Sequence, residues 1–296
     1  KYQNKKNNFD FLYLLTEPFA EERIPGSTQS SGIEMKKTLL FIPALLLFLY
    51  SCQEDDPSFP RVSDDPENEQ TGGNQETVTD YDGNVYPVVR IGRQVWMAEN
   101  LRVTHYADGT PIPFVEDGQG WIGVNNPQKA FCWYNDYPKT GEIYGALYNY
   151  SAAMNGADSS SAIPSGVQGV CPEGWHLPSD GEWKQLELHL GMNQDDADHT
   201  GWRGTDEGGM LKETGTGHWH SPNFGATNST GFRALPGGER SYDGKFHNGG
   251  LYARFWSATM KDYYICYRSL SYDGSWVGRH HYCHKNIGYS VRCVKN

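Results

Sequence analysis

The sequence predicts an α+β fold that is rich in loops and built mainly from short antiparallel strands, with one or two short helices. Three observations support this prediction. Glycine is frequent, with 34 residues among 296, helix signals are few, and short apolar runs flank turn dipeptides such as Asp273-Gly274. Aspartate and glycine both suit the positive φ of a two-residue hairpin turn, so hairpins should dominate the fold.

Five segments are predicted as strands because each is a short apolar run next to turn residues. They span residues 85–91, 94–98, 263–270, 276–282 and 289–294. Gly92-Arg93 separates the first two and Asp273-Gly274 lies between the next two, so each pair should form a hairpin. Counting back from the second turn places Ser271 opposite Trp276.

The strongest helix signal begins at Ser179, which is followed three residues later by Glu182. This spacing matches a capping box, in which each side chain bonds the backbone N–H of the other residue. An apolar stripe and a terminating glycine follow, at Trp183, Leu186, Leu190 and Gly191. A second short helix is predicted over residues 144–154, with four side chains facing inward: Tyr144, Leu147, Tyr148 and Met154.

Residues 35–52 have the features of a bacterial export signal. A lysine pair precedes an apolar run that is too short to span a bilayer, and the run ends at Cys52. The residues from Leu49 to Cys52 resemble the lipobox of bacterial lipoproteins. That resemblance implies cleavage before Cys52, acylation of the cysteine and a lipid anchor in the membrane. A single transmembrane helix is the alternative, and Pro43 together with the short length argues against it.

The export signal divides the chain into four predicted parts. Residues 1–34 are expected to be an upstream misread of the start and disordered, and residues 35–51 to be the signal peptide. Residues 52–76 are acidic and polar, which predicts a flexible tether. Residues 77–296 are expected to form one domain. The protein is therefore expected at the outer membrane, anchored by lipid.

The charge of the chain limits which classes of partner it can bind. Gln53-Glu54-Asp55-Asp56 follows the cysteine directly and resembles the surface-export signal of lipoproteins in the Bacteroidetes, although a solvated acidic linker explains it equally well. Both a surface-exposed and a periplasmic orientation stay open. The formal net charge of −11 argues against nucleic acid or an anionic membrane surface as a partner.

An ordered set of seven segments carries a family resemblance. It comprises residues 82–86, 91–101, 144–149, 169–183, 231–238, 255–259 and 290–293, and includes Gly174-Trp175-His176-Leu177. Together these segments resemble the Fibrobacter succinogenes major paralogous domain, which is common in Bacteroidetes lipoproteins and has no established biochemical activity. That family in turn resembles C-type-lectin-like folds, so the resemblance implies such a fold here. Residues 177–183 are also similar to a segment of formylglycine-generating-type enzymes, which share this broad fold.

Five cysteines remain once Cys52 is assigned to lipid, an odd number for an oxidising compartment. Positions such as Cys171 and Cys293 are bridged in lectin-like folds, so the resemblance favours a disulfide between them. Cys266 and Cys283 lie on the two strands of the second hairpin but out of simple register, so a bond between them requires a bulge or loop. Cys132 is then left free, although it could replace either partner.

Metal and catalytic motifs are absent from the sequence. On a strand, His280 and His284 would share one side while His281 and Cys283 share the other, and no second ligand set accompanies them. Exposed strand histidines are the prediction, with no metal. The calcium-binding triplets of lectins, a nucleophile elbow, a phosphate-binding loop and a dinucleotide fingerprint are all missing. We therefore predict no catalytic residue and no cofactor.

The remaining candidates lie on two loops, residues 217–224 and 237–242, because long loops in this part of lectin-like folds carry ligands. The predicted ligand-binding residues are Trp219, Asn223, Glu239, Arg240 and Tyr242. Aromatic side chains can stack on sugar rings, and polar side chains can bind hydroxyl groups. Each of Trp219, Phe224 and Phe232 taken singly is expected to pack inside, with at least one of them exposed.

The sequence thus predicts a cell-envelope lipoprotein that presents a lectin-like domain for binding extracellular glycan or protein. Two alternatives stay open. The first is a hydrolase or oxidase that uses the same loop cleft, which a carboxylate pair or a perturbed histidine would favour. The second is a structural component of a surface assembly, which a large exposed apolar patch would favour.

Overall fold

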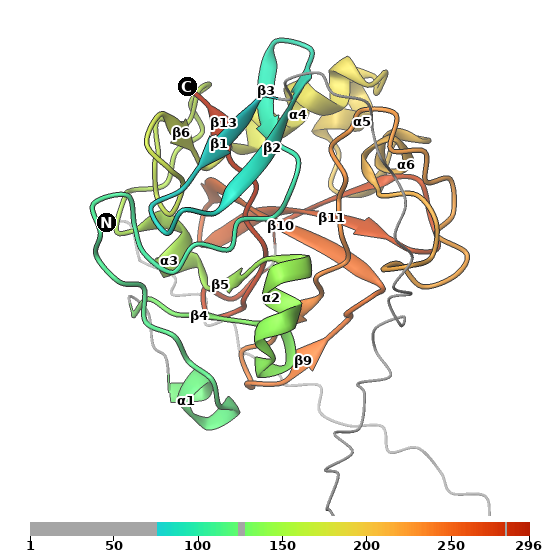
Figure 1. Ribbon diagram of the computed structural model, residues 1–296. Helices are drawn as coiled ribbons and strands as arrows, with labels where there is room; N and C mark the ends of the chain where they lie inside the picture. Colours follow the sequence, from blue (N-terminus) through green and yellow to red (C-terminus); the bar gives the residue numbers. More distant parts are fainter. Residues whose placement is uncertain (1–75, 124–127, 282) are drawn as a thin grey trace, which may run out of the picture. The chain divides into compact units, whose positions relative to one another are not determined.

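The computed structural model describes residues 76–123, 128–281 and 283–296 (Figure 1). The predicted export signal, Cys52 and the predicted tether up to residue 75 lie outside these residues. The described part is α+β with mostly short antiparallel strands, as predicted. It contains six short α-helices rather than one or two. No helix in these ranges is long and apolar enough to cross a membrane.

A five-stranded sheet joins the start of the domain to its C-terminal strand. Its order is β1 (Thr77–Thr79), β2 (Val85–Ile91), β3 (Gln94–Met97), β13 (Val294–Lys295) and β6 (Trp175–His176). Figure 1 shows the β2–β3 hairpin in cyan with β13 beside it. The hairpin turns at Gly92-Arg93 as predicted, with Ile91 opposite Gln94.

The last strand is shorter than predicted. Only Val294 and Lys295 form β13, whereas residues 289–294 were expected to be continuous. Tyr289 and Ser290 instead form single bridges to Tyr148 and Phe255. This segment passes three different partners in succession, so no continuous ladder forms along it.

A four-stranded antiparallel sheet forms the second half. Its order is β10 (Tyr252–Lys261), β11 (Tyr264–Ser271), β12 (Val277–His280) and β7 (Gly201–Arg203). Tyr267 lies opposite His280, and Ser269 opposite Gly278. This is the register obtained by counting back from Asp273-Gly274. The two small sheets are β4 (Phe131–Cys132) with β5 (Leu147–Tyr148), and β8 (Glu239–Arg240) with β9 (Phe246–His247).

The predicted main helix is present as α4 (Asp180–His189). Ser179 caps it, and the Glu182 carboxylate accepts a hydrogen bond from the Ser179 backbone N–H in a complete capping box. The helix ends before Gly191, whose φ of 114° lies in the left-handed region. The other helical elements are α1 (Gly118–Gly123), α2 (Pro138–Tyr144), α3 (Tyr150–Met154), α5 (Gln194–Asp198), α6 (Glu207–Leu211) and the 3₁₀ turn η1 (Tyr134–Asp136).

The helix predicted over residues 144–154 is wrong. Gly145 has a φ of 77°, which is not helical, and so ends α2. Glycine is required there because a side chain would collide with Asn100 and the Leu101 carbonyl. A two-residue strand, β5, follows, and Asn149 then caps α3 by accepting a hydrogen bond from the Ala152 N–H. The four side chains expected inside are all buried nevertheless.

The core is organised around α4 and one buried arginine. Trp183 of α4 packs against Trp96 of β3 at 4.6 Å between ring centroids and against Phe255 of β10 at 5.7 Å, so it lies between the two large sheets. Arg292 is fully buried with its guanidinium 4.4 Å from the centre of the Phe232 ring. It donates to the carbonyl oxygens of Met97, Phe232 and Arg233 and to Asn100 Oδ1. Burial lowers its pKa to about 9.

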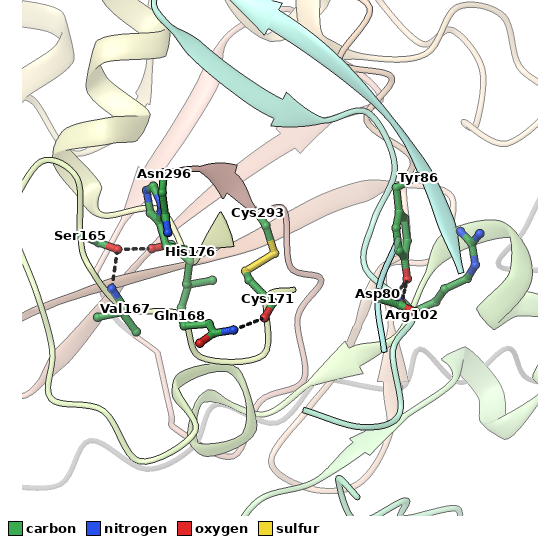
Figure 2. Close-up of a disulfide and its surroundings, with 11 residues drawn as sticks. Asp80, Tyr86, Arg102, Ser165, Val167, Gln168, Cys171, His176, Cys293 and Asn296 are labelled. Atoms are coloured by element: carbon green, nitrogen blue, oxygen red, sulfur yellow. Dashed lines mark hydrogen bonds between the residues drawn. A yellow bond between two sulfur atoms is a disulfide. The ribbon is translucent and has the colours of Figure 1, made fainter. Parts of the chain in front are cut away.

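A disulfide joins Cys171 to Cys293, the pair that the family resemblance favoured (Figure 2). It links the loop before β6 to the residue before β13, across a sequence separation of 122 residues. His176 lies nearby, with its Nδ1 2.7 Å from Asn296 Oδ1 and its Nε2 2.7 Å from Glu182 Oε1. These contacts hold the C-terminal strand against the start of α4.

The second predicted cysteine pair is not formed. Cys266 and Cys283 are both free. The register that places Tyr267 opposite His280 brings Cys266 level with His281, two residues short of Cys283, and β12 already ends at His280. Cys132 is free and buried.

Candidate functional site

Three of the five predicted ligand-binding residues are structural. Trp219 is fully buried and donates its indole N–H to the Ala234 carbonyl. Asn223 is buried and donates to the carbonyl oxygens of Glu213 and Gly215, which closes its own loop. Neither side chain reaches a ligand at the surface, because Trp219 packs in the same hydrophobic core as Trp96 and Trp183 and Asn223 bonds its own loop. Phe224 of the same loop is exposed, as expected for at least one aromatic there.

Arg240 is the third structural residue. It is fully buried, with Nη1 2.8 Å from Asp136 Oδ1 and its guanidinium 4.5 Å from the centre of the Phe246 ring. It also donates to the carbonyl oxygens of Val115, Glu116 and Gly244. Tyr242 is exposed and faces the His284 ring at 5.3 Å. Glu239 is half-buried and pairs with Arg254 on β10, a residue that sequence analysis did not single out.

The histidine tract does not form a metal site in the described residues. Alternation of faces holds only up to His280, where β12 ends, so His284 does not share a strand with it. Residues 76–123, 128–281 and 283–296 contain no group of three His, Cys, Asp or Glu side chains that could hold a metal ion. His280 instead belongs to an aromatic cluster on the four-stranded sheet.

The two faces of the four-stranded sheet are defined by its register. Arg254, Ser269, Gly278 and Trp202 lie opposite one another in turn across β10, β11, β12 and β7, so they share one face. We call this side the outer face. It also carries Tyr252, Tyr267, Ser271 and His280. The residues between them form the inner face, namely Arg203, Phe255, Arg268, Leu270, Val277 and Arg279.

The outer face carries a cluster of exposed or half-buried rings. Trp202 is 43% exposed, and Trp276, just before β12, is 37% exposed. The centroid of the Trp202 ring lies 6.2 Å from Tyr252, 6.4 Å from Trp276 and 5.5 Å from His280. Trp202 is therefore the centre of the cluster. At the other end of the face, Tyr289 covers Trp256 and Tyr267, which closes that end.

Small residues beneath the rings let the rings extend across the sheet. Trp202 and Tyr252 lie on the two edge strands, whose backbones are about 14 Å apart at ordinary strand spacing, yet their rings meet at 6.2 Å. Both side chains must therefore extend over β11 and β12. The residues beneath, Ser269, Ser271 and Gly278, are small and buried. A side chain added at Gly278 would collide with His280 and would lie 3.0 Å from the Trp202 ring.

A polar group borders the rings along β10. The Arg254 guanidinium lies 5.0 Å from the centre of the Tyr252 ring and forms an ion pair with Glu239. Glu239 also accepts a hydrogen bond of 3.0 Å from Asn248 Nδ2. Burial, together with Arg254, lowers the pKa of His280 to about 4. His280 is therefore neutral at physiological pH, and the ring cluster contains no charge of its own.

A buried lysine fixes the turn that carries Trp276. Lys212, directly after α6, is fully buried and donates to three backbone carbonyls: Phe224 at 3.0 Å, Ser271 at 2.7 Å and Gly274 at 2.8 Å. Burial lowers its pKa to about 8, while three acceptors on three sides suit the three N–H bonds of an ammonium group. Lys212 thus ties the β11–β12 turn to the loop that carries Phe224.

The inner face holds a buried ion network. Arg268 donates to Asp180 at 2.7 Å and to Glu187 at 2.6 Å, both on α4. Arg279 also pairs with Asp180 at 2.8 Å, and Arg203 with Glu187 at 2.6 Å. Burial alone would raise the pKa of Asp180, but Arg268 and Arg279 outweigh it and hold that pKa below its ordinary value. The network fixes β7, β11 and β12 against α4 and so decides which side chains face outward.

The fold and the outer face define an α+β domain with an exposed aromatic surface on an antiparallel sheet. Residues 89–295 match the Fibrobacter succinogenes major domain family. The chain belongs to this family, and the match lies within the domain predicted from residue 77 onward. No curated protein and no solved structure matches the chain. The likeness to C-type-lectin folds therefore stays a prediction.

Sequence reasoning missed the aromatic cluster for physical reasons. Trp202 lies on a strand of only three residues, too short to show any period. Tyr252 and Trp276 lie at strand ends, and their common face follows from pairing between strands rather than from spacing along the chain. One signal was available, since Trp276 lies next to the strongest turn dipeptide of the chain.

Proposed function

We propose that this protein is a cell-envelope lipoprotein whose domain binds extracellular glycan on the outer face of the four-stranded sheet. The observation that carries the proposal is the solvent exposure of Trp202 at the centre of a ring cluster on one face of the sheet. Large exposed aromatic groups on one surface are typical of binding sites. Flat rings suit the apolar faces of sugars, and tyrosine and tryptophan add polar groups at their edges.

The polar border supports glycan over a purely apolar ligand. Tyr252 and His280, both half-buried, supply hydroxyl and imidazole groups beside the rings, and hydroxyl-rich ligands require such partners. Glu239 is the carboxylate at this border, and it is engaged by Arg254 and Asn248. Because Glu239 is engaged, it is not free to act as one of the paired carboxyl groups that glycoside hydrolysis uses.

The envelope location rests on the predicted lipidation of Cys52. We propose that acylation there holds the domain at the outer membrane, with residues 53–76 as the tether. Replacing Cys52 with serine should release the protein from the membrane fraction, and protease treatment of intact cells should degrade it only if it faces outward. A Cys52→Ser protein that stays in the membrane fraction would contradict the anchor.

Glycan-array screening of the purified protein tests the binding proposal. Trp202→Ala and Trp276→Ala should each weaken binding of any recognised glycan by about tenfold or more, because tryptophans in a cluster commonly carry most of the binding energy. Tyr263 provides a matched control, since it is 89% exposed but lies in the turn between β10 and β11.

Tyr263→Ala should bind as the unmodified protein does. Failure of the unmodified protein to bind any glycan on the array would contradict the proposal. Equal losses in the Trp202 and Tyr263 variants would show that the outer face is not the binding surface.

A further inference from the structure

We infer that the outer face selects neutral glycans and excludes polyanionic ones such as uronic-acid or sulfated polysaccharides. This inference rests on the proposed function and narrows it to a ligand class. It follows from the state of each positively charged group on the four strands that form the face.

The arginines of the sheet are engaged by carboxylates. Arg203, Arg268 and Arg279 point to the inner face, where they pair with Glu187 and Asp180 of α4. Arg254 is the arginine of the outer face, and it pairs with Glu239. Each of these guanidinium groups therefore already has an anionic partner.

The Arg254 pair is well enclosed. Its side chain is 18% exposed and that of Glu239 is 12% exposed. The guanidinium lies near both the Tyr252 ring, at 5.0 Å, and the Tyr289 ring, at 5.8 Å. An incoming sulfate or carboxylate would have to displace Glu239 from a partly buried pair, and so would leave that carboxylate without its partner.

The other positively charged groups on or near the four strands do not provide a free partner for an anionic ligand. Lys261 ends β10 nine residues beyond Tyr252, a distance of roughly 30 Å along the strand. His280 lies among the rings, where burial and Arg254 lower its pKa. His247 faces Glu239 across the β8–β9 pair. None of these groups places a fixed positive charge beside Trp202.

Negative charge lies close to the rings instead. Asp273 is exposed in the β11–β12 turn, three residues before Trp276, and accepts a hydrogen bond from Ser271. The whole chain carries a formal net charge of −11. Lys212 bonds two carbonyls of this turn and offsets the charge of Asp273 locally. A polyanion would therefore meet repulsion mainly from the surrounding field, which a neutral sugar would not.

Binding of defined glycans at pH 8, where an ordinary histidine is neutral, tests this inference. The probes are oligosaccharides of neutral glucan, xylan and mannan, compared with alginate, polygalacturonate and heparin. We expect at least one neutral probe to bind, with a dissociation constant that changes less than twofold between 20 mM and 500 mM salt, because no ion pair forms. The polyanions should not bind.

A charge-neutralising variant sharpens the test. Glu239→Gln releases Arg254 from its partner, so this variant should gain binding of a polyanionic probe at 20 mM salt and lose it again at 500 mM. Glu76→Gln is the matched control, since it removes a carboxylate paired with Lys295 beside the other sheet. The Glu76 variant should gain nothing.

The outcomes separate this inference from the proposed function. Polyanion binding by the unmodified protein that Trp202→Ala abolishes would overturn the neutral selectivity and keep glycan binding. Failure of every probe, neutral and charged, would contradict the proposed function and the selectivity together. A Glu239→Gln protein that still ignores polyanions would contradict the role given to the Arg254 pair.

Discussion

Trp202 and Arg203 are neighbours on β7, and they show how the two faces of the four-stranded sheet differ. The tryptophan is 43% exposed on the outer face, whereas the arginine is buried against Glu187 on the inner face. Burying an arginine costs several kcal/mol before its partner repays it, and burying a tryptophan is favourable. Stability alone would favour the reverse placement. The exposed rings are therefore not explained by core packing, and a ligand-binding role gives them a reason.

The largest expected effect comes from breaking the inner face. Arg268→Met removes the buried partner that Asp180 and Glu187 of α4 share and leaves them only Arg279 and Arg203, so the free energy of unfolding should fall by about 3–5 kcal/mol. Urea denaturation measures this loss. Arg254→Met makes the same chemical change on the outer face and should cost less, because Arg254 pairs with one carboxylate and is 18% exposed, whereas Arg268 pairs with two and is 1% exposed. Equal losses would remove the distinction between the faces.

The Lys212 contact links the sheet to its loops and should have the next largest effect. Lys212→Met removes the donor from three carbonyl oxygens, and leaving buried acceptors unsatisfied costs about 1–3 kcal/mol. Hydrogen exchange should also accelerate in residues 271–276, which carry Trp276. Lys184→Met is the control, since Lys184 pairs with Asp198 at the surface. Unchanged exchange in the turn would show that Lys212 does not position it.

The arrangement of the rings on the outer face can be tested at Gly278. Gly278→Ala places a methyl group against His280 and Trp202, so the rings must shift while the inner face stays intact. Affinity for a bound glycan should fall by about threefold to tenfold, with little change in the urea midpoint. Gly217→Ala, where open space surrounds the added carbon, should leave affinity unchanged. Equal affinities in the two variants would argue that the ring arrangement is irrelevant.

The last expected effect appears only in acid, as a dependence of stability on pH. The pKa of His280 is lowered from 6.5 to about 4 in the fold, by burial first and Arg254 next. As the pH falls, the unfolded chain takes up this proton before the folded one, so stability decreases from about pH 6.5 through 4. His280→Gln should remove that part of the decrease, as measured by urea midpoints across this range. An unaltered pH profile in the variant would show that His280 is not buried as described.

Local signals predicted the local structure well. The capping box at Ser179 and Glu182 gave α4, and the Asp273-Gly274 turn gave the register of β11 with β12, because both depend on residues adjacent in the chain. The family resemblance supplied the Cys171–Cys293 bond. The helix and the hairpin register need no knowledge of distant segments.

The binding residues were harder to predict because exposure depends on distant segments. Trp219 and Arg240 are of residue types that are common in ligand sites, but other segments of the chain cover them. Trp202 is exposed because the ion network between α4 and the sheet turns Arg203 inward. A sequence motif on one segment cannot report which side of it another segment will cover.

The position of β13 also fixes the order in which the domain can assemble. This two-residue strand lies between β3 and β6 and pairs with Trp96 on one side and His176 on the other. Those partners leave the ribosome long before residue 294, so the middle of their sheet stays open until that residue has been synthesised. Pairing across such long separations is slow. This sheet therefore stays incomplete while the residues before β13 are translated, and a polypeptide in that state can still be threaded through a narrow channel.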